Sequence, residues 1–287
     1  MHWVGVDVGG TFTDVVVYDE ETGALEVAKS PTSPADPTVG LLNALAKLKV
    51  ALAATGRVVH GTTIGTNTIL ERKGAPVWMI TTRGFRDTLE IARTNRTVLY
   101  DIRACKPAPL VPRDRVVEVD ERLAFDGAVV RPLREADVRE AVGRIRAAVD
   151  GEGPGAVVIC FLHSYVNPAH ERAVARATTE VMPGWFVCTS EEVLPEFREY
   201  ERFSTAVLNA YIGPKVGGYL TALDTALAER GYAGRVFITT SSGGITTSQV
   251  AARFPVHTVL SGPAGGVAAA VNLGRLTGFR NLITYDM

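Results

Sequence analysis

Residues 3–18, WVGVDVGGTFTDVVVY, decide the fold at the start of the chain. Trp3 to Val8 is a short apolar run, Gly9 to Thr11 interrupts it, and Thr13 to Tyr18 is rich in β-branched residues. Two strand-like runs on either side of a glycine turn predict antiparallel strands. A further turn signal precedes the strand-like run Leu25 to Lys29. The sequence therefore predicts that the chain begins with an antiparallel meander.

After the meander, helical and strand-like segments alternate along the chain, which is typical of an α/β fold. Helices are expected to follow Asp36-Pro37, where Asp36 would cap the helix, and Asn167-Pro168, because proline favours the start of a helix. The first of these helices would span residues 37–49, and we expect the remaining ones at residues 66–73, 84–92, 133–149, 196–211, 214–230 and 265–276. We expect the remaining strands at residues 57–61, 77–82, 156–162, 185–189, 235–240 and 281–287.

The pattern also suggests a division of the chain into three parts. Residues 1–93 hold the meander and the first α/β elements. Residues 94–190 open with the proline-rich stretch Cys105 to Pro112, then alternate as a hairpin would, and end in α/β elements. Residues 191–287 hold a helical segment, a return to the first part and a helix of small residues. We interpret the middle part as an insertion into the first.

Composition excludes several classes of function. Thirty Lys+Arg and 31 Asp+Glu give a net charge of -1, which offers no reason to expect a nucleic-acid or membrane partner. The start has no basic region or cleavage site of a signal peptide, and no apolar run approaches the ~20 residues of a membrane span. The cysteines Cys105, Cys160 and Cys188 lack metal-ligand spacing, and the last two are expected in the core. We expect a cytoplasmic protein.

The glycine turn carries the strongest chemical signal. Glycines let backbone N–H groups approach a phosphate closely. Here they join two antiparallel strands, which excludes the phosphate loops that join a strand to a helix. Gly9 and Gly10 would bind phosphate, Thr11 and Thr13 would add hydroxyl donors, and Asp7 could hold magnesium or orient an attacking group. A plain hairpin turn is the alternative, but it needs neither the aspartate nor the threonines.

Polar residues also follow the other expected strands, where ligand crevices form in α/β folds. His60 could act as an acid, base or ligand, or could be structural. Thr62, Thr63 and Asn67 follow it, and Ser242, Gly243 and Gly244 follow the strand 235–240; a plain loop is the alternative there. Ser261 and Gly262 begin the small-residue helix, whose N–H groups suit an anion, or they only pack. Asp286 ends the last expected strand as Asp7 ends the first, and we expect both to bind metal.

These features resemble the superfamily of actin, sugar kinases and heat-shock chaperones. There, two similar domains each give a phosphate loop, and a small-residue helix connects them. More closely, the chain resembles the hydantoinase A/5-oxoprolinase family. The matching stretches are Val6 to Asp14 (VDVGGTFTD), His60 to Arg72 (HGTTIGTNTILER), Gly84 to Ala92 (GFRDTLEIA), Leu162 to Glu171 (LHSYVNPAHE), Pro195 to Ser204 (PEFREYERFS) and Leu260 to Gly266 (LSGPAGG).

The resemblance implies an actin-like, ribonuclease H-like domain that uses ATP and Mg²⁺ to phosphorylate the oxygen of a cyclic amide or ketone, before ring opening or carboxylation. It implies catalytic roles for Asp7, Asp14 and His60, and nucleotide contacts that extend to Gly265 and Gly266. It also implies an oligomer and a second, hydantoinase B-like subunit. Family members usually have Ala at Gly65 and Asn at Ser242, and they continue beyond Met287 with a second phosphate loop. We therefore expect a truncated chain that is inactive by itself.

Two other functions stay open at this point. The same scaffold also serves small-molecule kinases, which would release a stable phosphoester. Alternatively, the chain could be a half-clamp without activity, or an assembly module for a partner. His163 to Tyr165 lacks an acidic neighbour in sequence, so we interpret its histidine as structural. The charge-dense stretch Glu196 to Arg202 is interpreted as a solvated helix face, with a subunit contact as the alternative.

Overall fold

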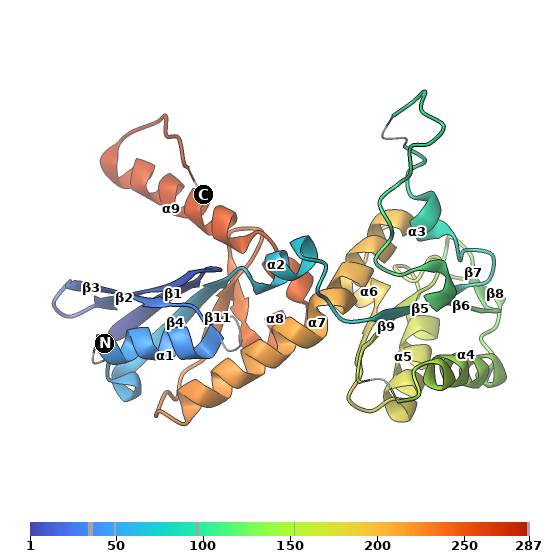
Figure 1. Cartoon of the computed structure of the whole chain (residues 1–287), viewed down its shortest axis with the longest axis horizontal. Coiled ribbons are helices and arrows are strands. Elements are labelled where there is room, and N and C mark those ends of the chain that lie inside the picture. The colour runs from blue at the N-terminus through green and yellow to red at the C-terminus, as the bar shows by residue number, and fades with distance from the viewer. Residues whose placement is uncertain (34–36, 49, 96–97, 152, 286–287) are drawn as a thin grey trace. The chain divides into compact units, whose positions relative to one another are not determined.

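The computed structural model describes residues 1–33, 37–48, 50–95, 98–151 and 153–285 (Figure 1). The described part of the chain divides into two compact units. Unit 1 comprises Met1–Lys73 and Lys215–Met287, and unit 2 comprises Gly74–Pro214. No helix of the described residues combines the length and the apolar character that crossing a bilayer requires.

Unit 1 is built on a mixed sheet with the strand order β12-β11-β4-β1-β2-β3. Its first strands are the antiparallel meander predicted from the sequence: β1 (His2–Val8), β2 (Phe12–Asp19) and β3 (Leu25–Pro31). Strands β4 (Thr55–Thr62) and β11 (Val236–Thr239) extend it in parallel, and β12 (Ile245–Thr247) is antiparallel to β11. A meander followed by parallel strands is the ribonuclease H-like topology of actin-like ATPase domains, as predicted.

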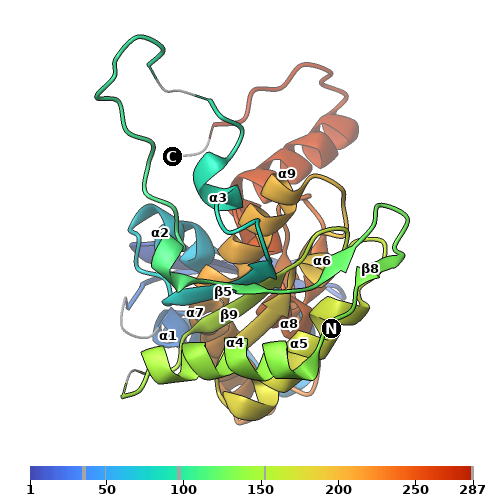
Figure 2. The same cartoon turned by 90° about the vertical axis from the view of Figure 1, so that its right-hand side faces the viewer.

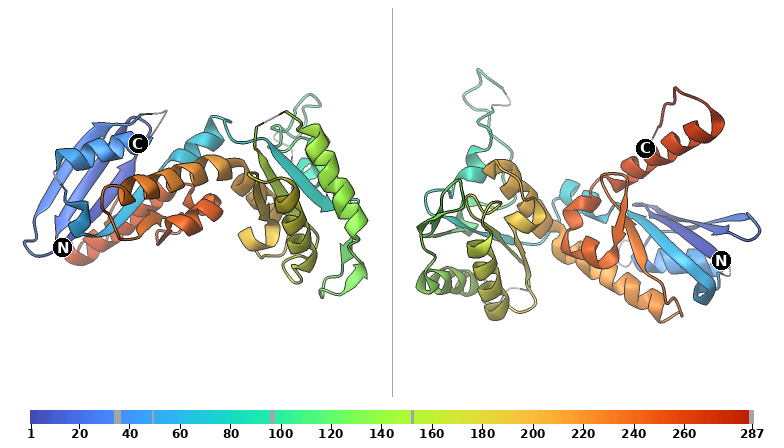
Figure 3. Two further views of the ribbon diagram at one scale, coloured as in Figure 1. Left: turned by 90° about the horizontal axis from the view of Figure 1, so that it is seen from below. Right: turned by 180° about the vertical axis from the view of Figure 1, so that it is seen from behind.

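Alternation along the meander separates a core face from an outer face. Val4, Val6 and Val8 are buried, whereas Gly5 and Asp7 are exposed, as a period of two along a strand requires. Helices α1 (Pro37–Lys47) and α7 (Glu199–Ala228) lie on one side of this sheet (Figures 1 and 3). The side chain of Asp7 therefore points away from the face that packs the core.

Helices follow several strands of unit 1. Helix α2 comes directly after β4 and helix α8 after β12, and helix α9 is the last element of the described part of the chain. Their bounds, with two 3₁₀ turns, are α2 (Ile64–Leu70), α8 (Ser248–Arg253), α9 (Ser261–Thr277), η1 (Leu52–Ala54) and η3 (Pro255–Thr258).

Unit 2 holds a parallel sheet with the order β10-β9-β5-β6. Helices α4 and α5 lie on one face of it (Figure 2), and their apolar side chains share a core with the strands, including Val142, Ile145, Ile159 and Val174. A hairpin, β7–β8, follows β6, as the alternating pattern predicted. The bounds are β5 (Val77–Thr82), β6 (Val116–Val119), β7 (Arg122–Leu123), β8 (Val129–Arg131), β9 (Ala156–Cys160), β10 (Phe186–Thr189), α3 (Thr88–Ile91), η2 (Arg113–Arg115), α4 (Glu135–Ala148), α5 (Ala169–Val181) and α6 (Ser190–Val193).

Helix α7 differs from the prediction of two helices at 196–211 and 214–230. It is a continuous helix from Glu199 to Ala228 with Pro214 inside it. Proline in a helix interior removes one hydrogen bond and costs about 3 kcal/mol. Ile212 and Val216 on either side of it are fully buried, so packing offsets that cost. The boundary between the units falls after Pro214, within this helix.

The division after Lys73 and Pro214 also differs from the suggested boundaries at 93 and 190. Strand β5 pairs with β6 and β9, and this pairing joins it to unit 2. The first sixteen residues of α7 complete the same unit, because Tyr211 accepts a backbone hydrogen bond from Ala75 (2.9 Å) and Arg202 binds Phe161.

Two further predicted elements are shorter or missing. The helix expected at 84–92 is limited to α3, because Gly84 and Ala92 have positive φ angles of 90° and 51°. The prediction of a strand at 281–287 is wrong for residues 281–285, which form no strand. Ile283 is 98% exposed there, and a strand forms only where a neighbouring strand binds its backbone. Asp36, expected to cap α1, and Asp286 and Met287 lie outside the described residues.

Candidate functional site

Asp7 lies in a row of polar residues that crosses the sheet of unit 1. It is directly opposite Asp14 on β2, and Asp14 is opposite Lys29 on β3. The Lys29 ammonium is 3.2 Å from Oδ1 of Asp14, which offsets the repulsion between the two carboxylates. On its other side Asp7 is opposite Gly61 of β4. Asp7 and Asp14, two of the predicted catalytic residues, are therefore neighbours on one face.

Thr239 reaches the same place from β11. A Cβ atom on Gly61 would lie 3.2 Å from Oδ1 of Asp7 and 3.5 Å from Oγ1 of Thr239. The glycine therefore leaves open the space that these two side chains border. We call Asp7, Gly61 and Thr239 the Asp7 cluster. It lies at the carboxyl ends of parallel strands, where α/β sheets bind ligands.

Two buried hydroxyl groups mark this end of unit 1. Within the described residues, neither Oγ1 of Thr239 nor Oγ of Ser261 has a hydrogen-bond partner, although both atoms are buried. A buried hydroxyl without a partner costs about 1–3 kcal/mol. Such groups are rare in folded proteins and call for an explanation. A polar ligand that accepts from these hydroxyls would supply one, so the residues present fit a phosphate.

The loop after β11 meets the start of α9. Gly243 has a φ of 81°, and a Cβ on it would lie 3.6 Å from the carbonyl oxygen of Ala264 in the first turn of α9. The Leu260 amide, just before α9, donates to Oγ1 of Thr66 in α2 (3.1 Å). Segments that follow β4 and β11 therefore converge on the N-terminus of a 17-residue helix. Helix N-termini attract anions through free N–H groups and the helix dipole.

Other predicted residues of this region have mixed placements. Ser242 hydrogen-bonds with Thr240 (3.0 Å) and lines a cavity of about 290 Å³ with His257. Gly244 lies beside Thr240, within van der Waals distance. Gly262, Gly265 and Gly266 lie in the first turns of α9 and, within the described residues, have nothing within 4 Å of an added Cβ. The nucleotide roles of all these residues stay predictions.

The glycine turn itself departs from the expected geometry. The Gly9 amide donates to the Phe12 carbonyl (3.0 Å), so it points into the hairpin and not toward a ligand. Thr13 is buried, and its hydroxyl shares a hydrogen bond with Thr32 (2.9 Å). It faces the core because Asp14, its neighbour, faces outward. Thr11 is exposed at the turn. In this geometry Gly9 and Thr13 shape the turn, and the role of Thr11 as a phosphate donor stays a prediction.

A cavity of about 750 Å³ adjoins the turn on its α7 side. We call it the hairpin cavity. It brings together the predicted residues Gly9, Gly10, Thr63 and Asn67. Its lining residues are Val8, Gly9, Gly10, Thr32, Pro37, Thr63, Ile64, Asn67, Glu71, Lys73, Lys215, Gly218, Tyr219 and Ala222.

Charge and hydrogen bonds organise the hairpin cavity. The side-chain amide of Asn67 donates to the Thr63 hydroxyl (3.3 Å), which in turn donates to the Val8 carbonyl (3.2 Å). The hydrogen bond from Lys73 lowers the pKa of Glu71, so this carboxylate is charged and neutralises one lysine. Lys215 adds a second cation. Thr62, also predicted, is buried and accepts a hydrogen bond from the Ile64 amide (3.3 Å).

His60 does not line this cavity. It is fully buried, and its Nε2 atom pairs with the hydroxyl of Tyr219 at 2.9 Å. Burial lowers the pKa of His60 from 6.5 to about 4, so the ring is neutral at pH 7. Tyr219 does line the cavity. The geometry supports a role for His60 in positioning Tyr219; its role as an acid or base stays a prediction.

Sequence reasoning missed several residues that the structure brings to the site. Thr239 is two residues before the predicted loop, and its place at a strand end was a usable signal. Tyr219, Lys73 and Lys215 gave no such signal, because they reach the cavity only through the packing of α7 and the end of α2. These three residues can be placed at the cavity only once the fold is known.

Unit 2 contains a buried polar network that the sequence did not predict. Glu171 accepts hydrogen bonds from the amides of Phe161 (2.6 Å) and Glu191 (3.0 Å) and from the Ser190 hydroxyl (2.7 Å). Arg202 is 1% exposed and donates to Ser190, to the Glu196 carbonyl and to the Phe161 carbonyl. The interpretation of 196–202 as a solvated face is therefore wrong at Arg202. As expected, Cys160 and Cys188 are buried free thiols.

The strand order of unit 1 and the convergence of strand ends on a helix N-terminus define an actin-like α/β domain. Within that class, the chain belongs to the hydantoinase/oxoprolinase family. Residues 3–182 match the hydantoinase/oxoprolinase N-terminal region, and residues 202–287 match the hydantoinase/oxoprolinase model.

Relatives cover almost the whole chain. An uncharacterized protein of Methanocaldococcus jannaschii is 39% identical over 99% of this chain, and caprolactamase subunit alpha of Pseudomonas jessenii is 33% identical over 99%. The crystal structure of that ATP-dependent caprolactamase superposes with a TM-score of 0.87 at 32% identity, and nucleotide-free acetone carboxylase with 0.86 at 30%. These matches cover 99% and 97% of this chain. The chain spans 41–42% of the length of these proteins.

Proposed function

We propose that this chain forms the phosphate-binding part of an ATP-dependent enzyme that activates the carbonyl oxygen of a cyclic amide. Ring opening by water would follow phosphorylation. The similarity to caprolactamase supports the proposal. The name of that enzyme denotes a cyclic amide, and the enzyme is ATP-dependent. Acetone carboxylase, a second structural relative, acts on a ketone with ATP. A neutral carbonyl group is common to both substrates.

The observation that carries the proposal is a pair of buried hydroxyls that lack a hydrogen-bond partner within the described residues: Thr239 in the Asp7 cluster and Ser261 at the start of α9. Thr239 and Ser261 can each donate a hydrogen bond to a phosphate oxygen. The N-terminus of α9 favours the same charge. A plain hairpin would need none of these groups.

Each group would have a distinct task. Asp7 and Asp14 would hold Mg²⁺ through their carboxylates, since magnesium takes one or two carboxylates together with phosphate oxygens. The bound ion would neutralise phosphate charge during transfer. Thr239, Ser261 and the α9 amides would orient the phosphoryl group, because phosphoryl transfer depends mainly on position and charge. Lys73 and Lys215 would attract the anion to the turn.

The remaining parts of the proposal concern the whole protein. Since one relative is named as a subunit, we propose that the enzyme works with a second subunit of the same system. We also propose a cytoplasmic location, which the free thiols of Cys105, Cys160 and Cys188 favour because reducing compartments keep thiols free.

Titration of Mg–ATP into the full-length gene product tests the assignment. Asp7→Asn should weaken the affinity about tenfold or more, equal to about 1.4 kcal/mol, because a metal-binding charge is lost. Asp126→Asn, at the β7–β8 turn of unit 2, is the matched control and should change nothing. Equal affinity of Asp7→Asn and the unmodified protein would remove the assignment.

The reaction product separates the proposed hydrolase from a small-molecule kinase. With ATP and a panel of lactams, the hydrolase should release phosphate only when a lactam is present. A kinase would accumulate a stable phosphoester and release no phosphate. Phosphorus NMR of the reaction mixture distinguishes the two results.

A further inference from the structure

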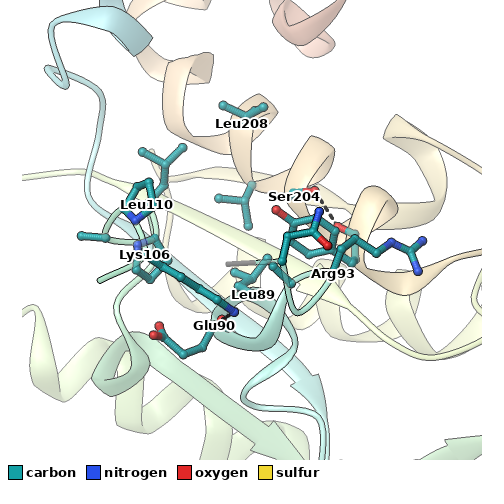
Figure 4. A pocket seen from close by; sticks show the side chains of 14 residues that line it. Leu89, Glu90, Arg93, Lys106, Leu110, Ser204 and Leu208 are labelled. Carbon is teal, nitrogen blue, oxygen red and sulfur yellow. Dashed lines mark hydrogen bonds between the residues drawn. The ribbon is translucent and has the colours of Figure 1, made fainter. Parts of the chain in front are cut away.

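Unit 2 contains a cavity of about 450 Å³ that shares no residue with the phosphate-binding region (Figure 4). Leu89, Glu90 and Arg93 border it from α3 and the residues after it, and Ser204 and Leu208 border it from α7. We call it the α3–α7 cavity. Its lining residues are Leu89, Glu90, Ala92, Arg93, Asn95, Lys106, Pro107, Ala108, Pro109, Leu110, Tyr200, Ser204, Val207 and Leu208.

The walls of the α3–α7 cavity are mainly apolar. Leucine, valine and proline side chains contribute from both helices and from the segment 106–110. Small-molecule sites typically measure roughly 300–1,000 Å³ and combine apolar walls with a few polar groups. The cavity therefore has the size and the lining of a small-molecule site.

The cations at its rim already have hydrogen-bond partners in the protein. Arg93 binds both carboxylate oxygens of Glu201, with Nε 2.7 Å from Oε1. This hydrogen bond lowers the pKa of Glu201, so the pair keeps opposite charges. The Lys106 ammonium donates to the carbonyls of Glu90 (3.2 Å) and Ile91 (2.8 Å) at the end of α3. An anionic ligand would have to compete with these partners, so the rim favours a neutral ligand.

Uncharged polar groups offer hydrogen bonds inside the cavity. The Ser204 hydroxyl donates to the Tyr200 carbonyl (2.5 Å), which leaves its oxygen able to accept a hydrogen bond from a ligand. The Asn95 amide can both donate and accept. A ligand with a carbonyl oxygen, with or without an N–H group, matches this set.

The backbone beside Arg93 is held in an uncommon conformation. Ala92 and Thr94, on either side of it, have φ angles of 51° and 59°. Backbone conformations with a positive φ in residues other than glycine cost about 1–3 kcal/mol each and concentrate at functional sites. This conformation carries Arg93 to Glu201 and so helps to neutralise Arg93.

We propose that the α3–α7 cavity is a binding site for a neutral, mostly apolar small molecule that carries a carbonyl group. Lactams and aryl ketones belong to this class, and carboxylate ions do not. The proposal stands on unit 2 alone and does not require phosphate binding in unit 1. It also predicts that charge at position 201 sets the choice between neutral and anionic ligands.

Saturation-transfer NMR on the full-length gene product tests the site with acetophenone, ε-caprolactam and hexanoate as probes. Acetophenone or ε-caprolactam should show saturable binding, with hexanoate at least about tenfold weaker. Leu208→Trp fills the cavity and should weaken the neutral probe about tenfold. Leu70→Trp, at an exposed position of α2 in unit 1, is the matched control and should have no effect. Unchanged binding in Leu208→Trp would overturn the proposed site.

A charge variant tests the ligand class without filling the cavity. Glu201→Gln removes the carboxylate that neutralises Arg93, and the half-exposed side chain at this position favours normal folding. Hexanoate should then bind about five- to tenfold more tightly, while the affinity for acetophenone changes less than about twofold. If hexanoate binding does not change, or if it equals acetophenone binding in the unmodified protein, the neutral ligand class is wrong.

Discussion

Gly40 permits the close contact between α1 and the meander. A Cβ at this position would lie 2.8 Å from Oγ1 of Thr13 and 3.0 Å from the Pro31 carbonyl oxygen. Both neighbours belong to strands that cannot shift easily. Gly40→Ala should therefore lower the free energy of unfolding by about 1–3 kcal/mol, the usual cost of overpacking. Urea unfolding followed by circular dichroism measures this change.

Gly143 gives the matched control for that substitution. It also lies in a helix, α4, but nothing lies within 4 Å of an added Cβ among the described residues. Gly143→Ala should stabilise unit 2 by about 0.5–1 kcal/mol, because alanine favours a helix more than glycine does. Equal effects of the two substitutions would show that α1 has no tight contact at Gly40.

At the scale of single residues, the sequence indicated which residues lie near the candidate site better than it indicated where their side chains point. Asp7 was recognisable because an aspartate before a glycine turn has no use in a plain hairpin. Thr13 was assigned to the ligand, although alternation along β2 puts it on the face opposite Asp14. Thr239 was missed because its buried hydroxyl, which lacks a partner within the described residues, can be recognised only once Asp7, Gly61 and β11 are neighbours. Pairing of strands distant in sequence supplied that information.

Arg202 links several elements of unit 2. Its three guanidinium nitrogens reach Ser190 at the start of α6, the Glu196 carbonyl and the Phe161 carbonyl after β9. A lysine has one donor atom and cannot serve three directions. Arg202→Lys should leave buried acceptors unpaired and lower the free energy of unfolding by about 3 kcal/mol.

Arg139 tests whether that loss depends on burial. It is exposed on α4 and pairs with Glu135 one turn earlier. Arg139→Lys keeps an exposed ion pair and should change stability by less than about 0.5 kcal/mol. Thermal and urea unfolding of both variants give the comparison. A similar small loss in Arg202→Lys would mean that the buried network contributes little.

At the scale of elements, local patterns predicted what local physics controls. The meander, the parallel strands and helices α4 and α5 follow from apolar periodicity and turn residues. Helix α7 did not follow, because burial of Ile212 and Val216 overrides the break that Pro214 suggests. The strand expected at 281–287 failed in its described part for the opposite reason. Its β-branched residues favour a strand, but no strand of the described part of the chain binds residues 281–285.

Across the whole molecule, the two units bury titratable groups whose effects on stability oppose each other. In unit 1, burial lowers the pKa of His60 from 6.5 to about 4. The unfolded chain therefore takes up this proton first as the pH falls. Neutral His60 contributes fully to the free energy of unfolding above pH 6.5, and this contribution is lost between pH 6.5 and about 4.

In unit 2 the stability changes with pH in the opposite direction. Burial raises the pKa of Glu171 from 4.5 to about 7, so the folded protein keeps a proton that the unfolded chain releases. Protonated Glu171 contributes fully to the free energy of unfolding below pH 4.5, and this contribution is lost as the pH rises to about 7. Each shift corresponds to about 3 kcal/mol over its full range. The two effects fall in the same pH range, so they nearly cancel in the free energy of unfolding of the whole chain.

Acidification from pH 7 to 5 should therefore weaken unit 1 by about 2 kcal/mol and strengthen unit 2 by about 2 kcal/mol. Hydrogen exchange with mass spectrometry, corrected for the intrinsic exchange rate, gives the opening free energy of each unit separately. Glu171→Gln cannot titrate, so it should abolish the trend in unit 2 and leave unit 1 unchanged. A parallel change in both units of the unmodified protein would contradict this assignment, because it would require groups that titrate with the same sign in both units.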